Sequence, residues 1–135
     1  MEHCWVVTGG SESEQSAAGL IGTLVREGIP TNHLHSVPIS LADSDNPEAV
    51  YRSISDIYAE AVDRDLQEDE IIGDYTGGTK SMTAGMILAC AAPLRHLQFM
   101  KPRRSTPDGR AEPGTESDPV AVDIRFQLIP ARGWR

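Results

Sequence analysis

The chain has 135 residues, 39% of them hydrophobic and 24% charged, which is the length and composition of one compact domain spanning residues 1–135. Its net charge of −8 argues against a general nucleic-acid binder, because such a protein neutralises many phosphates with Lys and Arg. No apolar stretch reaches the roughly 20 residues that a membrane helix needs, so we expect no membrane contact from this chain itself.

The charge is distributed unevenly along the sequence. Residues 1–75 contain 15 acidic and 3 basic side chains, whereas residues 76–135 contain 5 acidic and 9 basic ones. A local basic region on an acidic protein favours a small, multiply charged anion over bulk DNA or RNA.

The cysteines and histidines predict neither a disulfide nor a metal site. Cys4 and Cys90 lie in apolar segments, as small buried hydrophobic residues do, and no signal peptide precedes Cys4, so we expect a cytoplasmic protein. His33 and His35 alternate along one predicted strand without a third ligand in a motif, and we expect them to be exposed to solvent. We therefore expect no metal and no cofactor.

Hydrophobic periodicity predicts alternating strands and helices along the chain. Strands are expected at residues 4–7, 31–40, about 70–75, 96–100 and 118–129, and helices at residues 14–27, 46–65 and 81–92. Residues 41–46 are expected to form a polar loop. Residues 102–119, with four prolines and two glycines, are expected to form a mobile excursion between the last two strands, in which the arginines are solvated: Arg103, Arg104 and Arg110.

This order of elements implies an α/β fold, a Rossmann-like, open and mostly parallel sheet with helices on both faces and a C-terminal β-hairpin. The helix at residues 81–92 is apolar on all sides, so one side must face the sheet and another must meet a neighbouring helix or a second subunit.

A loop suited to phosphate follows the third predicted strand. Gly77 and Gly78 allow close approach of the backbone, Thr76 and Thr79 flank them, and Lys80 places a positive charge where the next helix begins. Unpaired N–H groups and the positive end of the helix dipole favour an anion there. The spacing matches neither a Walker A loop nor a G-x-G-x-x-G dinucleotide fingerprint.

Residues of the same types follow the first predicted strand: Thr8, Gly9, Gly10 and Ser11. Ligands of parallel α/β sheets bind outside the carboxyl ends of strands where the strand order reverses, so the two loops are expected to converge on one site. The alternative is an ordinary turn into the next helix. We call residues 8–11 the first glycine loop and residues 76–79 the second glycine loop.

Residues 74–82 resemble the D-x-T-G-G-T-K-x-M motif of CARF domains, the Rossmann-like sensors of type III CRISPR systems. The resemblance covers these nine positions in sequence and most of the chain in architecture. It implies a homodimer that binds a cyclic oligoadenylate across its twofold axis. The ligand-binding residues that follow from the two loops are Thr8, Gly9, Gly10, Ser11, Thr76, Gly77, Gly78, Thr79, Lys80, Ser81 and Met82.

The resemblance implies a function in antiviral defence in the bacterial or archaeal cytosol. The favoured hypothesis is a sensor that binds cyclic tetra-adenylate rather than hexa-adenylate and controls an effector not present in this chain, such as a nuclease or a membrane segment. The alternative is a metal-independent ring nuclease in which Lys80 and Ser11 stabilise the attacked phosphate. No histidine lies in either glycine loop to serve as a general base, which favours the sensor. A third hypothesis is a nucleotide-using enzyme on the same fold.

Overall fold

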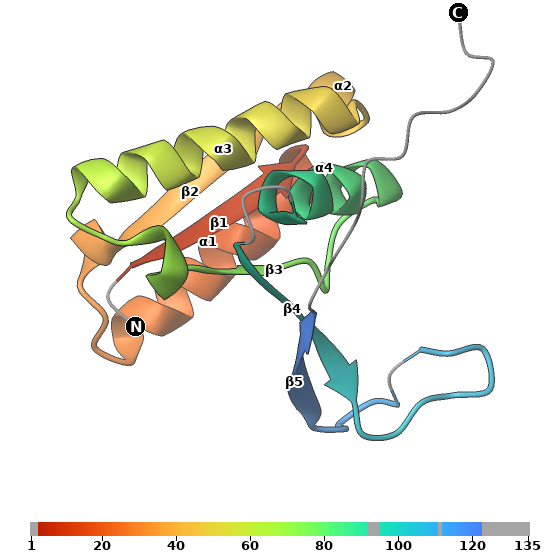
Figure 1. Cartoon of the computed structure of the whole chain (residues 1–135). Helices are drawn as coiled ribbons and strands as arrows, with labels where there is room; N and C mark the ends of the chain where they lie inside the picture. Colours follow the sequence, from red (N-terminus) through yellow and green to blue (C-terminus); the bar gives the residue numbers. More distant parts are fainter. Residues whose placement is uncertain (1–2, 92–94, 111, 123–135) are drawn as a thin grey trace, which may run out of the picture.

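The computed structural model describes residues 3–91, 95–110 and 112–122, which form a mixed α/β structure (Figure 1). The strands are β1 (Cys4–Gly9), β2 (Leu34–Ile39), β3 (Ile72–Asp74), β4 (His96–Pro102) and β5 (Ser117–Val122). The helices are α1 (Ser11–Arg26), α2 (Leu41–Ser44), α3 (Pro47–Asp63) and α4 (Lys80–Ala91), with short 3-10 turns η1 (Thr31–His33) and η2 (Glu68–Glu70).

The strands form two small sheets. Strand β1 pairs with β2 in parallel, from Cys4 opposite Leu34 to Gly9 opposite Ile39. In the second sheet β3 pairs with β4 in parallel and β4 pairs with β5 antiparallel. Among the described residues no ladder joins β1 to β3, so the structure confirms the α/β class and has two sheets in place of the one sheet expected.

The helices lie on opposite sides of the strands. Helix α1 covers one side of β1 and β2, and α3 and α4 lie together on the other side (Figure 1). Helix α3 begins where expected, because the Asn46 side chain accepts a hydrogen bond from Glu48 N at 3.0 Å and Pro47 occupies the first turn. Its buried stripe forms much of the core: Val50, Ile54, Ile57, Tyr58 and Ala61.

Helix α4 approaches the backbone of α3 at Gly85. A Cβ placed on Gly85 would lie 2.5 Å from Val50 Cβ and 2.9 Å from the Pro47 carbonyl oxygen. The all-apolar helix therefore meets a neighbouring helix, one of its two expected partners. Leu88 of α4 is 55% exposed.

Several boundaries differ from the sequence prediction. The loop expected at residues 41–46 contains α2, because the Ser40 hydroxyl accepts a hydrogen bond from Asp43 N at 3.1 Å and starts a short helical turn. The second strand is shorter than expected, since residues 31–33 form η1. Strand β5 is described as far as Val122, and the rest of the strand expected to reach residue 129 lies outside the described residues.

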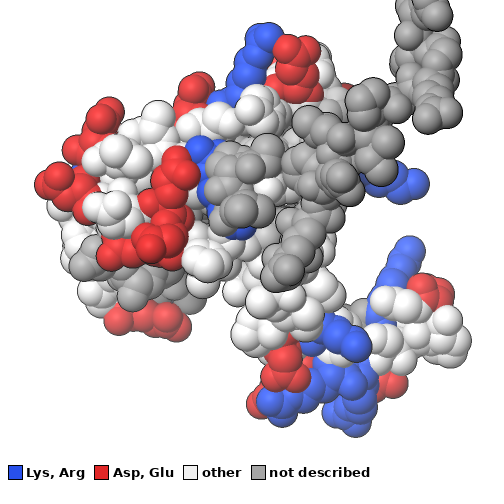
Figure 2. Space-filling model, in the orientation of Figure 1, with Lys and Arg blue, Asp and Glu red and all other residues white. Residues whose placement is uncertain are grey.

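The hairpin of β4 and β5 projects away from the helices (Figure 1), and its arginines pair with carboxylates. The ion pairs, all on exposed side chains, are Arg103 with Glu116 and Asp118, Arg104 with Glu112, and Arg110 with Asp108. Figure 2 shows blue and red side chains interleaved there. The basic second half of the sequence therefore does not form an unopposed basic surface on this hairpin.

No helix within the described ranges is long and apolar enough to cross a membrane.

Candidate ligand-binding site

The second glycine loop is anchored to β4. Asp74, the last residue of β3, accepts hydrogen bonds from Thr76 N at 2.8 Å and from Gln98 Nε2 at 3.0 Å. The Thr76 hydroxyl oxygen accepts from Met100 N at 2.7 Å. These contacts fix the path of the chain from β3 into the loop.

The loop ends in a capped helix. Gly78 has φ +99, a conformation that favours glycine, and it turns the chain toward α4. The Thr79 hydroxyl accepts a hydrogen bond from Met82 N at 3.2 Å, so Thr79 caps α4. Lys80 is the first residue of α4 and is exposed, and the first turn of α4 contains no acidic residue. An anion near this helix end therefore meets the positive end of the helix dipole and the Lys80 ammonium group.

The two glycine loops converge on the side chain of Met82. A Cβ placed on Gly9 would lie 3.0 Å from Met82 Sδ, and one placed on Gly78 would lie 3.3 Å from Met82 Cβ. Met82 thus fills the space between the end of β1 and the second glycine loop. The two glycine loops therefore lie close together in the structure, and the expectation that they form one ligand-binding site stays a prediction.

The first glycine loop is less suited to an anion than the second. Thr8 is buried, with 2% of its surface exposed, and its hydroxyl has no hydrogen-bond partner among the described residues. Gly10, with φ +103, precedes α1, and Ser11 is the exposed first residue of that helix. The first turn of α1 carries the carboxylates of Glu12 and Glu14, which oppose a second negative charge there.

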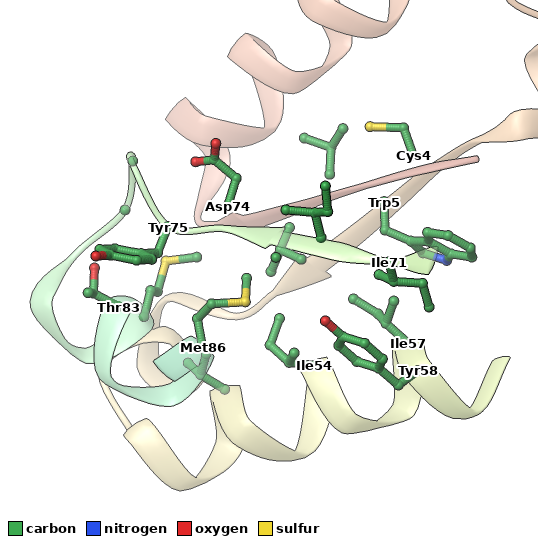
Figure 3. Close-up of a pocket in the computed structure, with 18 of the residues that line it drawn as sticks. Cys4, Trp5, Ile54, Ile57, Tyr58, Ile71, Asp74, Tyr75, Thr83 and Met86 are labelled. Carbon is green, nitrogen blue, oxygen red and sulfur yellow. The ribbon is translucent and has the colours of Figure 1, made fainter. Parts of the chain in front are cut away.

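A cavity of about 1060 Å³ is lined by residues of β1, β3, α1, α3 and α4 and reaches both glycine loops (Figure 3). Of the expected ligand-binding residues, five line it: Gly9, Gly77, Gly78, Thr79 and Met82. Six do not line it: Thr8, Gly10, Ser11, Thr76, Lys80 and Ser81. The middle of the cavity is apolar, with Val7, Ile54 and Ile71 among its walls.

Four further side chains at the loop end of the cavity were not among the expected ligand-binding residues: Asp74, Tyr75, Thr83 and Met86. Figure 3 shows Tyr75 and Thr83 side by side, with Asp74 on the other side of β3. Asp74 and Tyr75 lie inside the motif itself. Thr83 and Met86 follow Thr79 and Met82 by one helical turn, and this spacing was the signal available in the sequence.

The surroundings of Asp74 keep its carboxyl group ionised. Burial raises the pKa of Asp74, but hydrogen bonds from Thr76 and Gln98 outweigh it and leave the pKa below its ordinary value. The neighbouring Tyr75 ring packs against Phe99, with ring centroids 5.7 Å apart. The loop end of the cavity therefore combines a carboxylate with a supported aromatic ring.

Histidines and Trp5 gather at the opposite end of the cavity. His3 Nδ1 lies 2.9 Å from His35 Nε2, the Trp5 ring stacks on His35, and the Trp5 indole donates to Glu60 Oε2 at 2.9 Å. Burial, followed by the charge of Arg64, lowers the pKa of His35. The expectation that His35 is exposed is wrong, because these rings leave it half-buried.

His33 is half-buried as well, in tilted contact with the His3 ring, so the same expectation is wrong for it. Over the part of the chain that the structure describes, no group of three or more His, Cys, Asp or Glu residues is arranged to hold a metal ion.

A scan against protein-family models finds none that matches this chain, and a search of curated proteins finds no similar sequence.

Proposed function

We propose that this chain is a sensor domain that binds a cyclic oligoadenylate, with cyclic tetra-adenylate favoured over hexa-adenylate. In this proposal it acts in type III CRISPR antiviral defence in the bacterial or archaeal cytosol and controls an effector not present in this chain. The observation that carries the proposal is the convergence of the two glycine loops on Met82, beside a helix that begins with Lys80. The resemblance of residues 74–82 to the CARF motif supplies the ligand class.

The chemistry of the loop supports a phosphate ligand. The first turn of α4 offers N–H groups with the positive end of the helix dipole, and Lys80 adds a full charge without a carboxylate in that turn. Gly77 adds backbone that a ligand can approach, because a Cβ placed there would meet nothing within 4 Å.

The proposal includes a finer architecture. A Rossmann-like sheet would place β1 and β3 as neighbours, in the order β2, β1, β3, β4, β5, in place of the two sheets of the structure. Two such chains would face each other through their glycine loops, with one ligand ring over the twofold axis.

Isothermal titration with cyclic tetra-adenylate tests the proposal. We expect one ring per two chains, and a Lys80→Ala variant whose Kd rises by about 10- to 100-fold, since a hydrogen bond to a charged group contributes a few kcal/mol. Arg26→Ala is the matched control, because Arg26 lies in the last turn of α1, far from the glycine loops. Arg103→Ala is a second control, because Arg103 is held by Glu116 and Asp118 on the hairpin.

The proposal fails if cyclic tetra-adenylate and cyclic hexa-adenylate both give no heat with the unmodified chain. Equal loss of affinity in Lys80→Ala and in either control would remove the role of Lys80. A measured stoichiometry of one ring per chain would overturn the proposal that two chains share one binding site.

A further inference from the structure

We infer that three histidines at the start of the sheet of β1 and β2 form a proton-sensitive contact, which is packed while the rings are neutral and opens when they become charged together. We call His3, His33 and His35 the histidine cluster. The cluster lies at the starts of β1 and β2, whereas the first glycine loop lies at the end of β1. The inference therefore does not depend on what the glycine loops bind.

The pairing of β1 with β2 brings the rings of the cluster together. Trp5 of β1 pairs with His35 of β2, and their rings stack with centroids 4.7 Å apart. The His3 ring centroid lies 4.7 Å from that of His33 and 5.2 Å from that of His35. Three groups that can each take up a proton near neutral pH are thus in direct contact.

The contact between His3 and His35 tolerates one proton but not two. The His3 Nδ1 and His35 Nε2 atoms are 2.9 Å apart, so one nitrogen donates a hydrogen and the other accepts it. An imidazole keeps an accepting nitrogen only while the ring is neutral. When both rings are charged, each presents an N–H to the other and the hydrogen bond is lost. A charge on His33 adds repulsion, because this ring is in contact with His3.

The charged side chains around the cluster do not compensate for this repulsion. Glu60 and Arg64, at the end of α3, face His35, but the Arg64 guanidinium pairs with the Glu60 carboxylate at 3.1 Å. Among the described residues the other titratable groups that act on His35 are His3 and His33, which repel a proton there when charged. Burial, followed by the charge of Arg64, lowers the pKa of His35. The folded chain therefore resists charging His35.

Opening of the cluster would loosen the start of the sheet from α3. Trp5 links β1 to α3 through its hydrogen bond to Glu60, and it links β1 to β2 through its stack on His35. Repulsion among the imidazole rings acts on both links. The other end of the ladder, where Gly9 pairs with Ile39, lies at the far end of both strands and should stay closed.

Urea unfolding of the full chain as a function of pH tests the inference. Because the unfolded chain binds protons that the cluster excludes, stability is fully present above the ordinary pKa of histidine, about 6.5, and is lost as the pH falls below it. Each excluded proton raises the unfolding equilibrium constant by up to about 10-fold per pH unit. We expect a rise of about 10-fold for the parent between about pH 7 and about pH 5.5.

His35→Gln keeps a hydrogen-bonding side chain that cannot take up a proton. The rise in its unfolding constant over the same pH range should therefore be about 3-fold or less. His96→Gln is the matched control, because His96 is exposed at the start of β4, and this variant should keep the rise of about 10-fold.

Trp5 fluorescence gives a second readout that does not depend on the folding of a histidine variant. The chain has two tryptophans, so Trp134→Phe leaves Trp5 as the single tryptophan signal. A charged imidazole in contact with an indole quenches its emission. The Trp5 emission of the folded Trp134→Phe chain should therefore change as the pH falls, with a midpoint below the ordinary pKa of histidine.

Three results would overturn the inference. The first is an unfolding constant that changes with pH no more in the parent than in His35→Gln. The second is Trp5 emission that is constant over this pH range. The third is loss of the pH dependence in His96→Gln, which would place the proton-sensitive group in the sheet of β3, β4 and β5.

Discussion

Met82 lies directly against Gly9, although 73 positions separate them in sequence: a Cβ placed on Gly9 would lie 3.0 Å from Met82 Sδ. The same Cβ would lie 2.7 Å from Ser44 Cβ in α2. The end of β1, the end of α2 and the first turn of α4 therefore meet at Gly9. Only a residue without a side chain fits there.

Gly9→Ala should consequently destabilise the fold. Ser44 Cβ cannot move away as the end of a flexible side chain can, so we expect a loss of about 1–3 kcal/mol in the free energy of unfolding, as measured by urea denaturation. Gly77→Ala is the control, because a Cβ there meets nothing within 4 Å. Equal losses in the two variants would contradict the close packing at Gly9.

Substitution of Gly77 in the second glycine loop separates stability from binding. Gly77→Val should leave the free energy of unfolding within about 0.5 kcal/mol of the parent, as surface substitutions usually do, and should weaken cyclic tetra-adenylate binding. Gly78→Val is a less informative variant, because Gly78 has φ +99 and any branched side chain there strains the backbone.

Gly85→Ala should destabilise the chain through the contact between α3 and α4. The added Cβ would lie 2.5 Å from Val50 Cβ, and we expect a loss of about 1–3 kcal/mol. Gly19→Ala in α1 is the control, since a Cβ there has open space and alanine raises helix propensity by up to about 1 kcal/mol. The Gly85→Ala/Val50→Gly double variant, which removes the Val50 Cβ, should lose less than the sum of the single losses, and strict additivity would argue against the contact.

Asp74 should give the fold a pH-dependent contribution to stability. Because the pKa of Asp74 is below its ordinary value in the folded state, this contribution is fully present above the unfolded pKa and is lost as the pH falls through the folded pKa. The stability difference between the parent and Asp74→Asn should therefore shrink as the pH falls below the ordinary pKa of an aspartate. Gln98→Leu removes one donor to Asp74 and should move this loss to higher pH. A difference that does not change with pH would contradict the hydrogen-bonded carboxylate.

Loss of the Arg95 side chain should destabilise the fold more than loss of the Arg64 side chain. Its Nη2 donates to Glu68 Oε1 at 2.8 Å, its Nη1 donates to the Ala89 carbonyl at 2.8 Å, and its guanidinium lies 4.1 Å from the centroid of the Tyr58 ring. The side chain is 12% exposed, so Arg95→Ala should cost about 2–4 kcal/mol. Arg64→Ala, which breaks an exposed pair with Glu60, should cost less than about 1 kcal/mol. Equal thermal denaturation midpoints for the two variants would contradict this ranking.

The proposed sensor should retain its ligand rather than cleave it. Donors that hold the ground state and the transition state equally well do not accelerate a reaction, and no histidine lies in either glycine loop. Incubation with excess cyclic tetra-adenylate, followed by chromatography, should show slow or undetectable turnover. Multiple turnovers that yield linear fragments with 2′,3′-cyclic phosphate, lost in Lys80→Ala or Ser11→Ala, would favour the ring nuclease.

The sequence predicted those parts of the fold that depend on local patterns. The helix that begins at Asn46 and Pro47 was predicted because a cap, a proline and an apolar stripe coincide there. Helix α2 was not predicted, since four residues carry no periodicity and the single signal is the capping hydroxyl of Ser40.

Features that depend on distant contacts could not be predicted. Periodicity identifies β1 and β3 as strands but does not determine which edges pair, so the cavity that these strands help to line had no signal in the sequence. The pairing of Arg103 with Glu116 and Asp118 depends on the register of β4 and β5, which no local pattern fixes. Tyr75 lies inside the motif and Met86 follows Met82 by one helical turn, but neither signal indicates that the two side chains line one cavity.

The contact between Gly85 and Val50 also limits which substitutions related sequences can carry at these two positions. Helix α4 carries Lys80 at its start, so any residue that pushes α4 away from α3 also moves the charge at the glycine loop. A related sequence with alanine at position 85 would need glycine, which has no Cβ, at position 50 to keep that charge in place. Substitutions at these two positions, 35 residues apart, are therefore expected to occur together.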